Sequence, residues 1–496
     1  MSHVLILSIL VFYIGVLLII SRVTAEKNQS NSAFFNANRR SKWYLVAFGM
    51  IGSSVSGISL VAVPAMVQGS GFTYLQMCLG FIVGYIAVAT VLLPLYYKNN
   101  LTSIYGYLEN RFGKNSHKTG SWFFIISKLI TSASKLYVAV LVLHQFLFSQ
   151  WNIPIWLTVT LCVLMIWLYT FRGGIKTIVF TDALQSFVLF SVIIMMLFNI
   201  ANLLDFSFFD MMKSVNSSNF SKTFIISDFV SDKNFFKQFF SGIFIVIVMT
   251  GLSQDMMQTT LSCKNLREAK KNMIWYGTGF VPLNLLLLTL GALILIFADK
   301  NGIILPENPN SIVPMFCAKF FSPAVCVLFI LGIIAATFNA ADSALTSITT
   351  IFFVDILKNN NSNVPRLKKR STFKFSFDEI KLRKLVYFGV CAAEIFIVLL
   401  FDNVQNKSLL DTIYTIVGYA YGPLLGLFTF GLFTKFQVKD KIIPYLAIIS
   451  PFLTFGISYF CKTKFNYIFG YEILIINGLL MFLMMISIGI KKRCQE

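Results

Sequence analysis

The sequence predicts an all-α polytopic membrane protein with about 13 transmembrane helices. Hydrophobic residues make up 56% of the 496 residues, charged residues only 12%, and the mean hydropathy is +0.74. A soluble domain carries about 25% charged residues, so the composition excludes a soluble fold. Segments of about 20 residues, long enough to cross a bilayer, recur along the chain. They fall near residues 2–21, 43–66, 73–97, 121–148, 153–171, 174–200, 236–260, 273–298, 324–357, 384–401, 408–433, 441–460 and 469–490.

The charges between these segments predict the orientation in the membrane. The first segment has no basic stretch before it and no small-residue cleavage site before Arg22, so we expect a retained helix and not a signal peptide. Lysine and arginine gather after spans one, three, seven and nine and at the chain end, whereas the loop at 201–234 balances lysines against aspartates. The positive-inside rule then predicts a multi-pass protein of the cell (inner or plasma) membrane, with the N-terminus outside and the C-terminus cytoplasmic.

The same distribution gives the net charge of +20 a topological cause, so the lipid bilayer is the expected partner and nucleic acid is not. The three histidines and eight cysteines form no metal-binding or disulfide pattern, and the cysteines are expected to pack as small apolar groups. A membrane enzyme is not expected, because no pair of nucleophile and base and no metal cluster is evident.

Two predicted spans contain glycines and small polar residues between apolar stretches. The second reads "GMIGSSVSGISLVAVPAMVQGSG" (49–71) and the seventh reads "FSGIFIVIVMTGLSQDMMQTT" (240–260). They lie five spans apart, so each would be the first helix of a group of five. Because five is an odd number, the second group would enter the membrane from the side opposite to the first. Interrupted helices at matching positions of inverted halves indicate a transport site at mid-membrane. The alternative is that the glycines only allow close helix packing.

The predicted helix at 324–357 carries a polar stripe. At helical spacing one face takes Asn339, Asp342, Ser343, Thr346 and Thr350. A carboxylate at mid-membrane costs about 2.5–3.5 kcal/mol, so Asp342 needs a cation, a proton or a basic partner. Its oxygen-bearing neighbours suit a small hard cation. An ion pair with Lys128 or Lys135, both deep in span four, is the alternative.

A further motif, "RGGIKTIVFTDALQ" (172–185), places Asp182 about 9 Å beyond Lys176 along a helix, inside the membrane. This motif resembles the GG-x-x-x-x-V-x-TD-x-x-Q element of the sodium/solute symporter family, which transports sugars, proline, pantothenate or sialic acid. The resemblance covers residues 1–490. Its other specific parts are "AATFNAADSALTSITTIFFVDI" (335–356), "SQDMMQTTLSCKNLREAKK" (253–271) and "GYAYGPLLGLFTFGLF" (418–433).

The resemblance implies a LeuT-like core of two inverted five-helix repeats, with one extra helix before it and two after it. The implied parts are an N-terminal helix and cytoplasmic loop at 1–42, repeat one at 43–200, an extracellular loop at 201–234, repeat two at 235–433 and two C-terminal helices with the tail at 434–496. It also implies secondary active transport: cation-coupled symport of a small organic solute by alternating access, with sodium as the expected coupling ion and no other cofactor.

The family's main sodium site takes backbone carbonyls from the broken first core helix, and a carbonyl and two adjacent hydroxyls from the eighth. Here the hydroxyl pair falls on Asn339 and Ala340, so one side-chain oxygen is missing. A second sodium site of the family uses an Asp at 182 and hydroxyls at 342 and 343, where this chain has Asp342 and Ser343. Two carboxylates repel unless a cation or proton lies between them, so we expect the cation to have shifted toward Asp182 and Asp342. The predicted cation-binding residues are Gly52, Val55, Ala336, Asn339, Asp182, Asp342 and Ser343.

The galactose-type polar set of the family is missing, since its positions fall on Ser59, Gln76 or Cys78, Val246, Met249 and Thr278. The residues expected to line the solute site, or else only to pack helices, are Ser56, Ser59, Gln76, Tyr414 and Tyr419. A carboxylate-bearing solute is compatible, because the N-terminus of a broken helix favours anions. Two alternatives remain: a proton-coupled symporter in which Asp182 or Asp342 titrates, and a transport-incompetent membrane sensor or structural remnant of the family.

Overall fold

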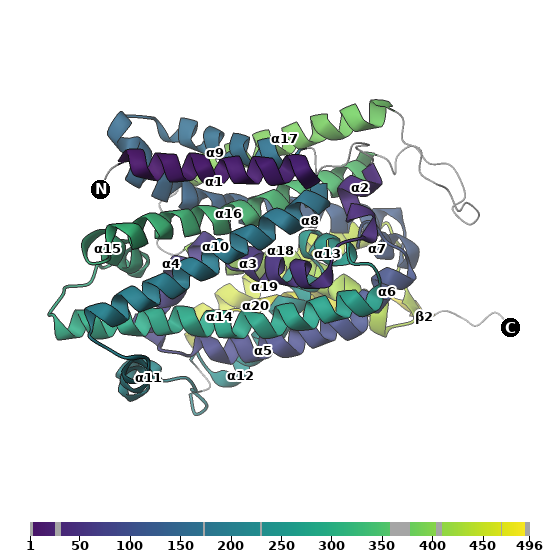
Figure 1. Cartoon of the computed structure of the whole chain (residues 1–496). Helices are drawn as coiled ribbons and strands as arrows, with labels where there is room; N and C mark the ends of the chain where they lie inside the picture. The colour runs from purple at the N-terminus through teal and green to yellow at the C-terminus, as the bar shows by residue number, and fades with distance from the viewer. Residues whose placement is uncertain are drawn as a thin grey trace.

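Long helices lying side by side form most of the protein (Figure 1). The computed structural model describes residues 3–24, 31–171, 174–228, 231–357, 377–402, 409–467 and 469–491. The longer helices are α1 (His3–Thr24), α3 (Trp43–Ser54), α4 (Gly57–Ser70), α5 (Tyr74–Ala87), α8 (Lys114–Leu143), α9 (Ile155–Thr170), α10 (Gly174–Leu203), α11 (Phe208–Ser217), α12 (Phe235–Val246), α13 (Gln254–Leu261), α14 (Leu266–Lys300), α15 (Ile312–Lys319), α16 (Pro323–Ile351), α17 (Phe377–Asp402), α18 (Leu409–Phe433), α19 (Ile443–Phe465) and α20 (Ile473–Ile488).

Shorter elements extend or connect these helices. They are α2 (Asn31–Asn36), η1 (Ala37–Arg39), η2 (Val88–Leu92), α6 (Leu93–Lys98), α7 (Gly106–Arg111), η3 (His144–Phe148), η4 (Ser149–Trp151), η5 (Asn219–Ser221), η6 (Ile247–Gly251), η7 (Pro309–Ser311), η8 (Phe352–Leu357), β1 (Phe436–Gln437) and β2 (Ile490–Lys491). The two strands pair antiparallel. Four of the short elements, η2, η3, η6 and η8, are π-helical turns that continue a neighbouring α-helix.

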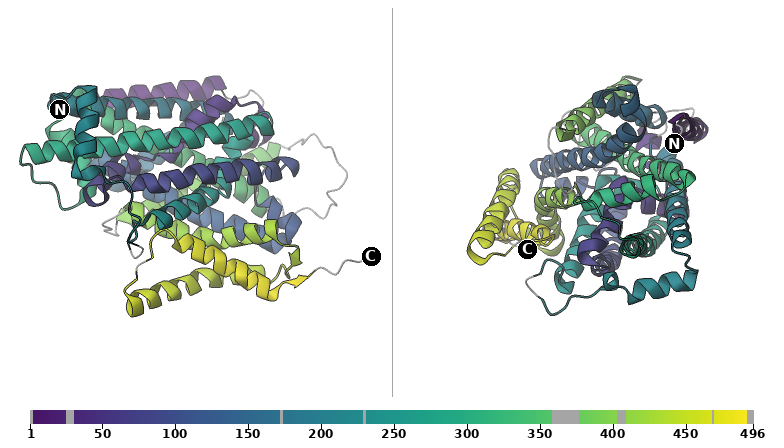
Figure 2. Two further views of the ribbon diagram at one scale, coloured as in Figure 1. Left: turned by 90° about the horizontal axis from the view of Figure 1, so that it is seen from below. Right: turned by 90° about the vertical axis from the view of Figure 1, so that its left-hand side faces the viewer.

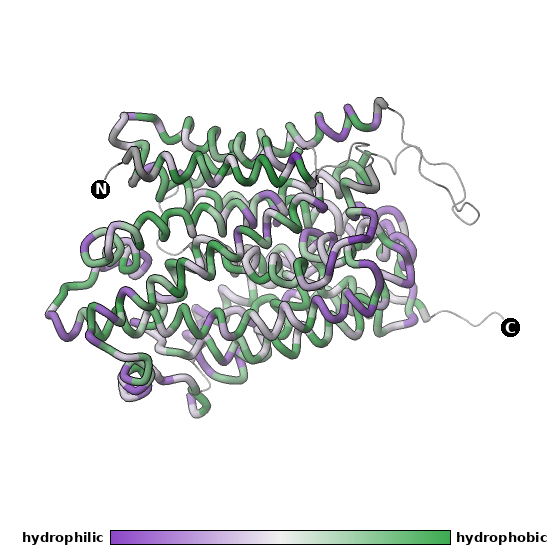
Figure 3. Tube along the Cα trace, viewed as in Figure 1, coloured by the Kyte–Doolittle hydropathy of each residue, from purple (hydrophilic) through white to green (hydrophobic). Residues whose placement is uncertain are grey.

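Apolar helices of membrane-spanning length confirm the predicted all-α polytopic class. Among the described residues, eight helices are long and apolar enough to cross a bilayer, or up to ten spans if each of two bent pairs counts as one. Three further apolar helices are shorter: Ile155–Thr170, Val417–Phe433 and Ile473–Ile488. The predicted count of 13 is therefore not confirmed by length and composition. Hydrophobic residues cover the lengths of the helices, and polar residues gather toward the helix ends (Figure 3).

The connecting segments lie at two ends of the helix bundle. We call the basic end the one formed by residues 99–113, 262–265 and 434–441, where Tyr97 and Ser41 both bond backbone of the 262–263 turn. The opposite end holds residues 201–228, 231–234, 466–467 and 469–472. Helix α1 begins at the opposite end, and β2 lies at the basic end (Figure 1). The first and last described elements thus lie at opposite ends of the bundle.

Both predicted broken spans are confirmed. Helices α3 and α4 meet at an angle of 60°, and the unwound residues Val55 and Ser56 between them have extended backbone. The segment Phe235–Gly251 and helix α13 meet at 64°. An unwound backbone exposes carbonyl and amide groups, which lipid cannot satisfy. In the second break two tyrosine hydroxyls satisfy carbonyls: Tyr96 donates to Gly251 O and Tyr105 donates to Leu252 O, each at 2.8 Å.

The C-terminal helices α19 and α20 lie together on one side of the bundle, next to α18 (Figure 2). Asn477 joins α20 to α18, because its amide donates to Gly418 O at 3.0 Å and to Tyr419 O at 2.9 Å. Gly422 allows this approach, since a Cβ there would lie 2.3 Å from the Asn477 side chain. This packing fixes which face of α18 remains for the rest of the bundle.

At the basic end, Arg111 closes the C-terminal end of α18. Its guanidinium donates to Gly431 O at 3.2 Å, Thr434 O at 3.0 Å and Phe436 O at 2.8 Å. The last carbonyls of a helix have no partner within the helix, so a planar donor with several N–H groups is well matched to this position. Asp440, a few residues later, accepts from the backbone N–H groups of Asn115 and Ser116 at the start of α8.

We therefore expect Arg111→Ala to destabilise the protein. Loss of hydrogen bonds from a charged donor costs about 1.5–3 kcal/mol, and the substitution leaves partly buried carbonyls unpaired. The apparent melting temperature of the detergent-solubilised protein should fall by several degrees, and Arg111→Lys should recover only part of the loss. Arg267→Ala, at an exposed arginine of the same end, is the matched control and should leave the melting temperature unchanged. Equal melting temperatures for both alanine variants would contradict the role given to Arg111.

Candidate functional site

The first broken span lies directly against α10. A Cβ at Gly52 would lie 2.0 Å from Ser186 Oγ, and one at Gly49 would lie 2.8 Å from Asp182 Cβ, so both positions need glycine. Ser186 Oγ donates to Asp182 O at 2.7 Å and lies 3.2 Å from Gly49 O, which it also contacts as a donor. The close approach brings the end of α3 next to the part of α10 that carries Asp182.

The break also lies against the polar face of α16. A Cβ at Gly57, the first residue of α4, would lie 2.6 Å from Thr337 Oγ1. The side-chain amide of Asn339 donates to Asp182 O at 3.4 Å, so α16 meets α10 at the same level. Helices α3, α4, α10 and α16 therefore converge around Val55 and Ser56, and both of these residues are buried.

Two carboxyl groups lie at this convergence. Asp182 is 2% exposed and Asp342 is 0% exposed, and the two groups are close enough to interact electrostatically. Tyr169 of α9 donates to Asp342 Oδ2 at 2.9 Å. In the described part of the chain, Oδ1 of each aspartate makes no hydrogen bond, and no lysine, arginine or histidine lies within 4.0 Å of either carboxyl group. Buried carboxyl groups without a basic partner are costly, so this arrangement requires a cation or a proton.

The oxygen donors fit a small hard cation. Asn339 Oδ1 is buried and, within the described residues, accepts no hydrogen bond. Ser343 adjoins Asp342, and Tyr13 of α1 lies close to Gln185 and to both carboxyl groups. Carboxylate, amide, hydroxyl and backbone oxygens are the ligands that sodium-sized hard cations take. The residues that could hold the ion are therefore Asp182, Asp342, Asn339, Ser343 and the backbone of the break.

The structure brings most of the predicted cation-binding residues into one region. Gly52, Asn339, Asp182 and Asp342 are joined by the contacts above, and Val55 lies two residues before Gly57. The others lie on the same buried length of α16, where Ala336 precedes Thr337 and Ser343 is 6% exposed. Their role as ligands stays a prediction.

The predicted solute-binding residues are spread more widely. Ser56 and half-buried Ser59 lie at the break, where Ser56 O accepts from Ser59 N at 2.9 Å. Gln76 lies at the opposite end, where its side chain bonds Lys233 O at 3.0 Å and Ile225 N at 3.1 Å and so holds the 201–234 loop. The ring of Tyr419 lies 6.4 Å from that of Phe455 on α19. The side chain of Tyr414 lies outside the described residues.

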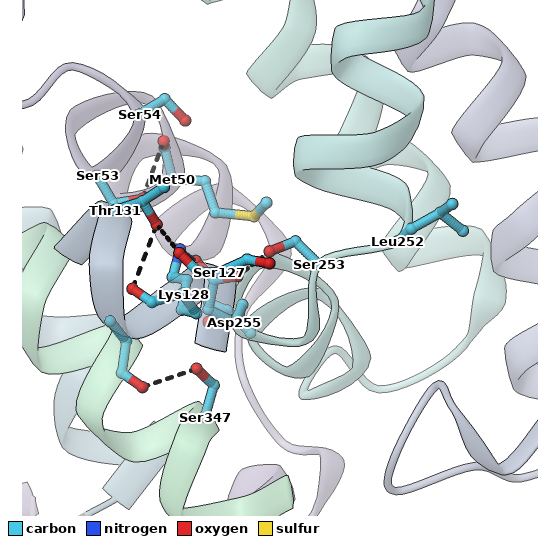
Figure 4. A network of polar contacts seen from close by, with 12 residues as sticks. Met50, Ser53, Ser54, Ser127, Lys128, Thr131, Leu252, Ser253, Asp255 and Ser347 are labelled. Atoms are coloured by element: carbon cyan, nitrogen blue, oxygen red, sulfur yellow. Dashed lines mark hydrogen bonds and ion pairs between the residues drawn. The ribbon is translucent and has the colours of Figure 1, made fainter. Parts of the chain in front are cut away.

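The position of Lys128 tests the predicted alternative that Asp342 forms an ion pair with a lysine of α8. Its ammonium group is ion-paired with Asp255 of α13, two residues after the unwound Ser253 (Figure 4). The predicted alternative of an ion pair between Lys128 and Asp342 is therefore wrong. Lys135, seven residues further along α8, also makes no ion pair with Asp342 within 4.0 Å.

Three groups near the site were missed by sequence reasoning. Gln185 follows Asp182 by one helical turn and ends the quoted motif, so helical spacing could have placed it on the same face. Tyr169 and Tyr13 reach the carboxyl groups from α9 and α1, and no local pattern connects them with residues so far along the chain.

Two bent spans with buried acidic groups on the helices packed beside them are the arrangement of a cation-coupled secondary transporter. The chain belongs to the sodium:solute symporter family, whose model matches residues 34–439. This confirms the family that the motifs predicted.

Individual relatives and structures agree with this assignment. The chain is 25% identical over 434 residues to the sodium/sialic acid symporter NanT of Aliivibrio fischeri, covering 85% of this chain and 82% of the relative. It is 24% identical to the human sodium/iodide cotransporter, covering 82% and 61% of the two chains. A substrate-bound, outward-open structure of a Na+-coupled sialic acid symporter superposes with a TM-score of 0.81 at 20% identity, covering 96% of each chain. Mhp1, a nucleobase-cation-symport-1 family transporter, superposes with a TM-score of 0.56 at 14% identity, covering 93% of this chain and 95% of that chain. These superpositions show the shared LeuT-like fold.

The contact between α3 and α10 leads to a prediction at Gly52. Gly52→Ala places a methyl group where Ser186 already lies, and overpacking of this kind costs about 1–3 kcal/mol or more. We expect a lower apparent melting temperature and a smaller yield of monodisperse protein. Gly69→Ala, on α4 of the same broken span, is the matched control, because a Cβ there meets nothing within 4 Å. If Gly52→Ala is as stable as Gly69→Ala, the close contact is not present.

Proposed function

We propose that this protein is a sodium-coupled symporter of a small organic solute, working by alternating access in the cell membrane. The observation that supports the proposal most directly is the pair of buried carboxyl groups, Asp182 and Asp342. They lie on two helices beside the first break, with an unpaired oxygen on each and no basic residue within 4.0 Å in the described chain.

Asp342 supports a sodium site displaced from the usual one. Ala340 offers no side-chain oxygen, whereas Asp342 lies one turn beyond Asn339 on the same face of α16. Because Tyr169 holds one oxygen of Asp342, the other oxygen is left for an ion. A sodium ion held by both carboxylates would remove their mutual repulsion. The free energy of binding would therefore be more favourable than with either carboxylate alone.

Binding at this position would act on the solute site through the break. The backbone of Gly52 and Val55 belongs to the unwound end of α3, and Ser56 and Ser59 begin the next helix. An ion held jointly by this backbone, α10 and α16 would order the break and with it the solute-facing serines. We propose that this coupling joins the movements of ion and solute.

The N-terminus of α4 favours an anionic solute. This helix begins at Gly57, inside the membrane, and no side chain caps its first N–H groups. The free N–H groups and the helix dipole attract anions. Relatives named as transporters of sialic acid, iodide and monocarboxylates take anions, which supports the same class of solute here.

The orientation follows from the basic end. Arg111, Lys114, Lys264 and Arg267 gather there, so we propose that this end is cytoplasmic, with the N-terminus outside. The two bent spans then open two inverted repeats, which we place at 43–200 and 235–433 as the sequence suggested.

Sodium should stabilise the purified protein through the two carboxylates. A ligand at about 100 times its Kd stabilises by about 2.7 kcal/mol, so the apparent melting temperature should rise in sodium chloride and not in choline chloride. The rise should be lost in Asp182→Asn and Asp342→Asn. Asp299→Asn, outside this region on α14, is the control and should keep it. If sodium has no effect on the wild-type protein, or if both aspartate variants keep the full rise, the proposed ion site is wrong.

Uptake into proteoliposomes tests coupling and solute class together. An inward sodium gradient should drive uptake of radiolabelled sialic acid or of a short monocarboxylate, with Asp342→Asn reducing it at least tenfold. A pH gradient without sodium should give no stimulation. Stimulation by the pH gradient alone would favour a proton-coupled symporter, and no uptake under any gradient, with no sodium stabilisation, would favour a transport-incompetent member of the family.

A further inference from the structure

A second charged cluster lies between α8, α13 and α17, apart from the two aspartates of the proposed sodium site. Lys128 of α8 is ion-paired with Asp255 Oδ2, and Ser253 donates its hydroxyl to Asp255 Oδ1 (Figure 4). The Asp255 side chain is 2% exposed and that of Lys128 is 14% exposed. The pair thus links α8 to the half of the second broken span that follows the break.

Glu394 of α17 is close enough to Lys128 to interact with it electrostatically. It is 0% exposed and stands near the middle of the apolar span Glu379–Asp402. Neither of its carboxyl oxygens makes a hydrogen bond within the described residues. The hydroxyl of Ser132 and the ammonium of Lys128 are the polar groups close enough to stabilise its charged form. A buried, membrane-embedded acid without a bonded partner indicates a functional group.

The helices packed against α17 supply few charges that could pair with Glu394. Helix α9 has no charged residue, and α16 contributes Asp342, which Tyr169 holds. The π-helical turn η8 contributes Asp355, which accepts hydrogen bonds at the basic end from Ser103 and Ser121 and lies 3.1 Å from His117. Helix α8 carries four lysines: Lys114 and Lys118 lie in its first turns at the basic end, and two more lie further along the helix.

Those two lysines are Lys128 and Lys135, which lie seven residues apart on the face that also carries Ser132. Of the two, Lys128 is the one that interacts electrostatically with Glu394, whereas Lys135 interacts with Lys128 and Asp255. In the conformation described, the ammonium of Lys128 is bound to Asp255. Lys128 therefore interacts with two buried acids and is ion-paired with one of them, Asp255.

An ionised carboxylate left unpaired inside a protein costs several kcal/mol, so an acid in the position of Glu394 retains its proton. Lysine is suited to change partners, because its ammonium is a point charge with three donors on a flexible stem. The partner change needs relative movement of α13 and α8. Rocking of one group of helices against another is the usual basis of alternating access.

We propose that Glu394 is a proton-binding site, and that Lys128 moves from Asp255 to Glu394 when α13 separates from α8. In the conformation described, Glu394 carries a proton and Lys128 neutralises Asp255. When Lys128 moves to Glu394, the carboxylic O–H bond breaks, the proton passes to water on the side to which the cluster then opens, and the ammonium pairs with the carboxylate formed. The same water hydrates the carboxylate of Asp255, which Lys128 has left. The movement rests on alternating access; the proton site does not depend on sodium.

Infrared spectroscopy of the full-length protein in lipid bilayers tests the proton site. A protonated carboxyl group gives a carbonyl-stretch band that shifts in heavy water and that carboxylates lack. We expect one such band to be present in the wild type and absent from Glu394→Gln, so that it appears as a positive band in the wild type minus variant difference spectrum. Asp402→Asn, at an exposed acid on the same helix, is the matched control and should show no loss. A Glu394→Gln spectrum equal to that of the wild type would overturn the proposal.

The exchange of partners is tested with Glu394 left in place. Asp255→Asn frees Lys128 to pair with Glu394, so the same band should be lost although Glu394 is present. Lys128→Met removes the base, so Glu394 should keep its proton and Asp255 should gain one, which enlarges the band. A band that persists in Asp255→Asn would overturn the exchange. Monodisperse elution of each variant shows that it has folded, and because sodium is not varied, failure of the sodium site leaves these results unaffected.

Discussion

Backbone groups that an unwound helix exposes inside a bilayer must find partners within the protein, because lipid offers none. The two broken spans meet this constraint differently. In the second break, Tyr96 and Tyr105 bond the carbonyls of Gly251 and Leu252, so protein side chains complete that backbone. The first break lies against α10 and α16, whose side chains there hold unpaired oxygens. The second break is thus a supported bend, and the first is the one that a bound ion can complete.

The acidic residues beside the two breaks also differ in whether the protein neutralises them. Beside the second break, Asp255 is neutralised by Lys128, so this acid needs no ion from outside. Beside the first break, Asp182 and Asp342 have no base within 4.0 Å in the described chain. A paired acid stabilises one arrangement of helices, whereas an unpaired pair of acids makes the arrangement depend on what binds between them. The two clusters can therefore respond to different signals.

The features that could be predicted from the sequence are local ones. Composition and segment length predict the class, glycines and small polar residues predict both breaks, and helical spacing places Asn339 and Asp342 on one face. Contacts between distant segments could not be predicted. Whether Lys128 pairs with Asp255 or with Asp342 depends on the rotation of α8. Gln76 bonds backbone groups of the 201–234 loop, and such backbone partners have no sequence signature. Tyr419 likewise faces α19 because Asn477 holds α18 against the C-terminal helices.

Tyr169 explains how one residue could take over the role of a missing ligand. A carboxylate that replaces a hydroxyl brings a full negative charge, which attracts a cation, but also more freedom of rotation, which makes the ion site less well defined. The phenol of Tyr169 donates to one oxygen of Asp342, which restrains the rotation of the carboxylate and leaves its other oxygen without a hydrogen bond in the described chain. Hydrogen bonds to an ionised acceptor are about twice as strong as neutral ones, so this contact also stabilises the charged form that an ion requires. Under the proposed function, the loss of an oxygen at Ala340 and the presence of Tyr169 on α9 are therefore two parts of one rearrangement of the site.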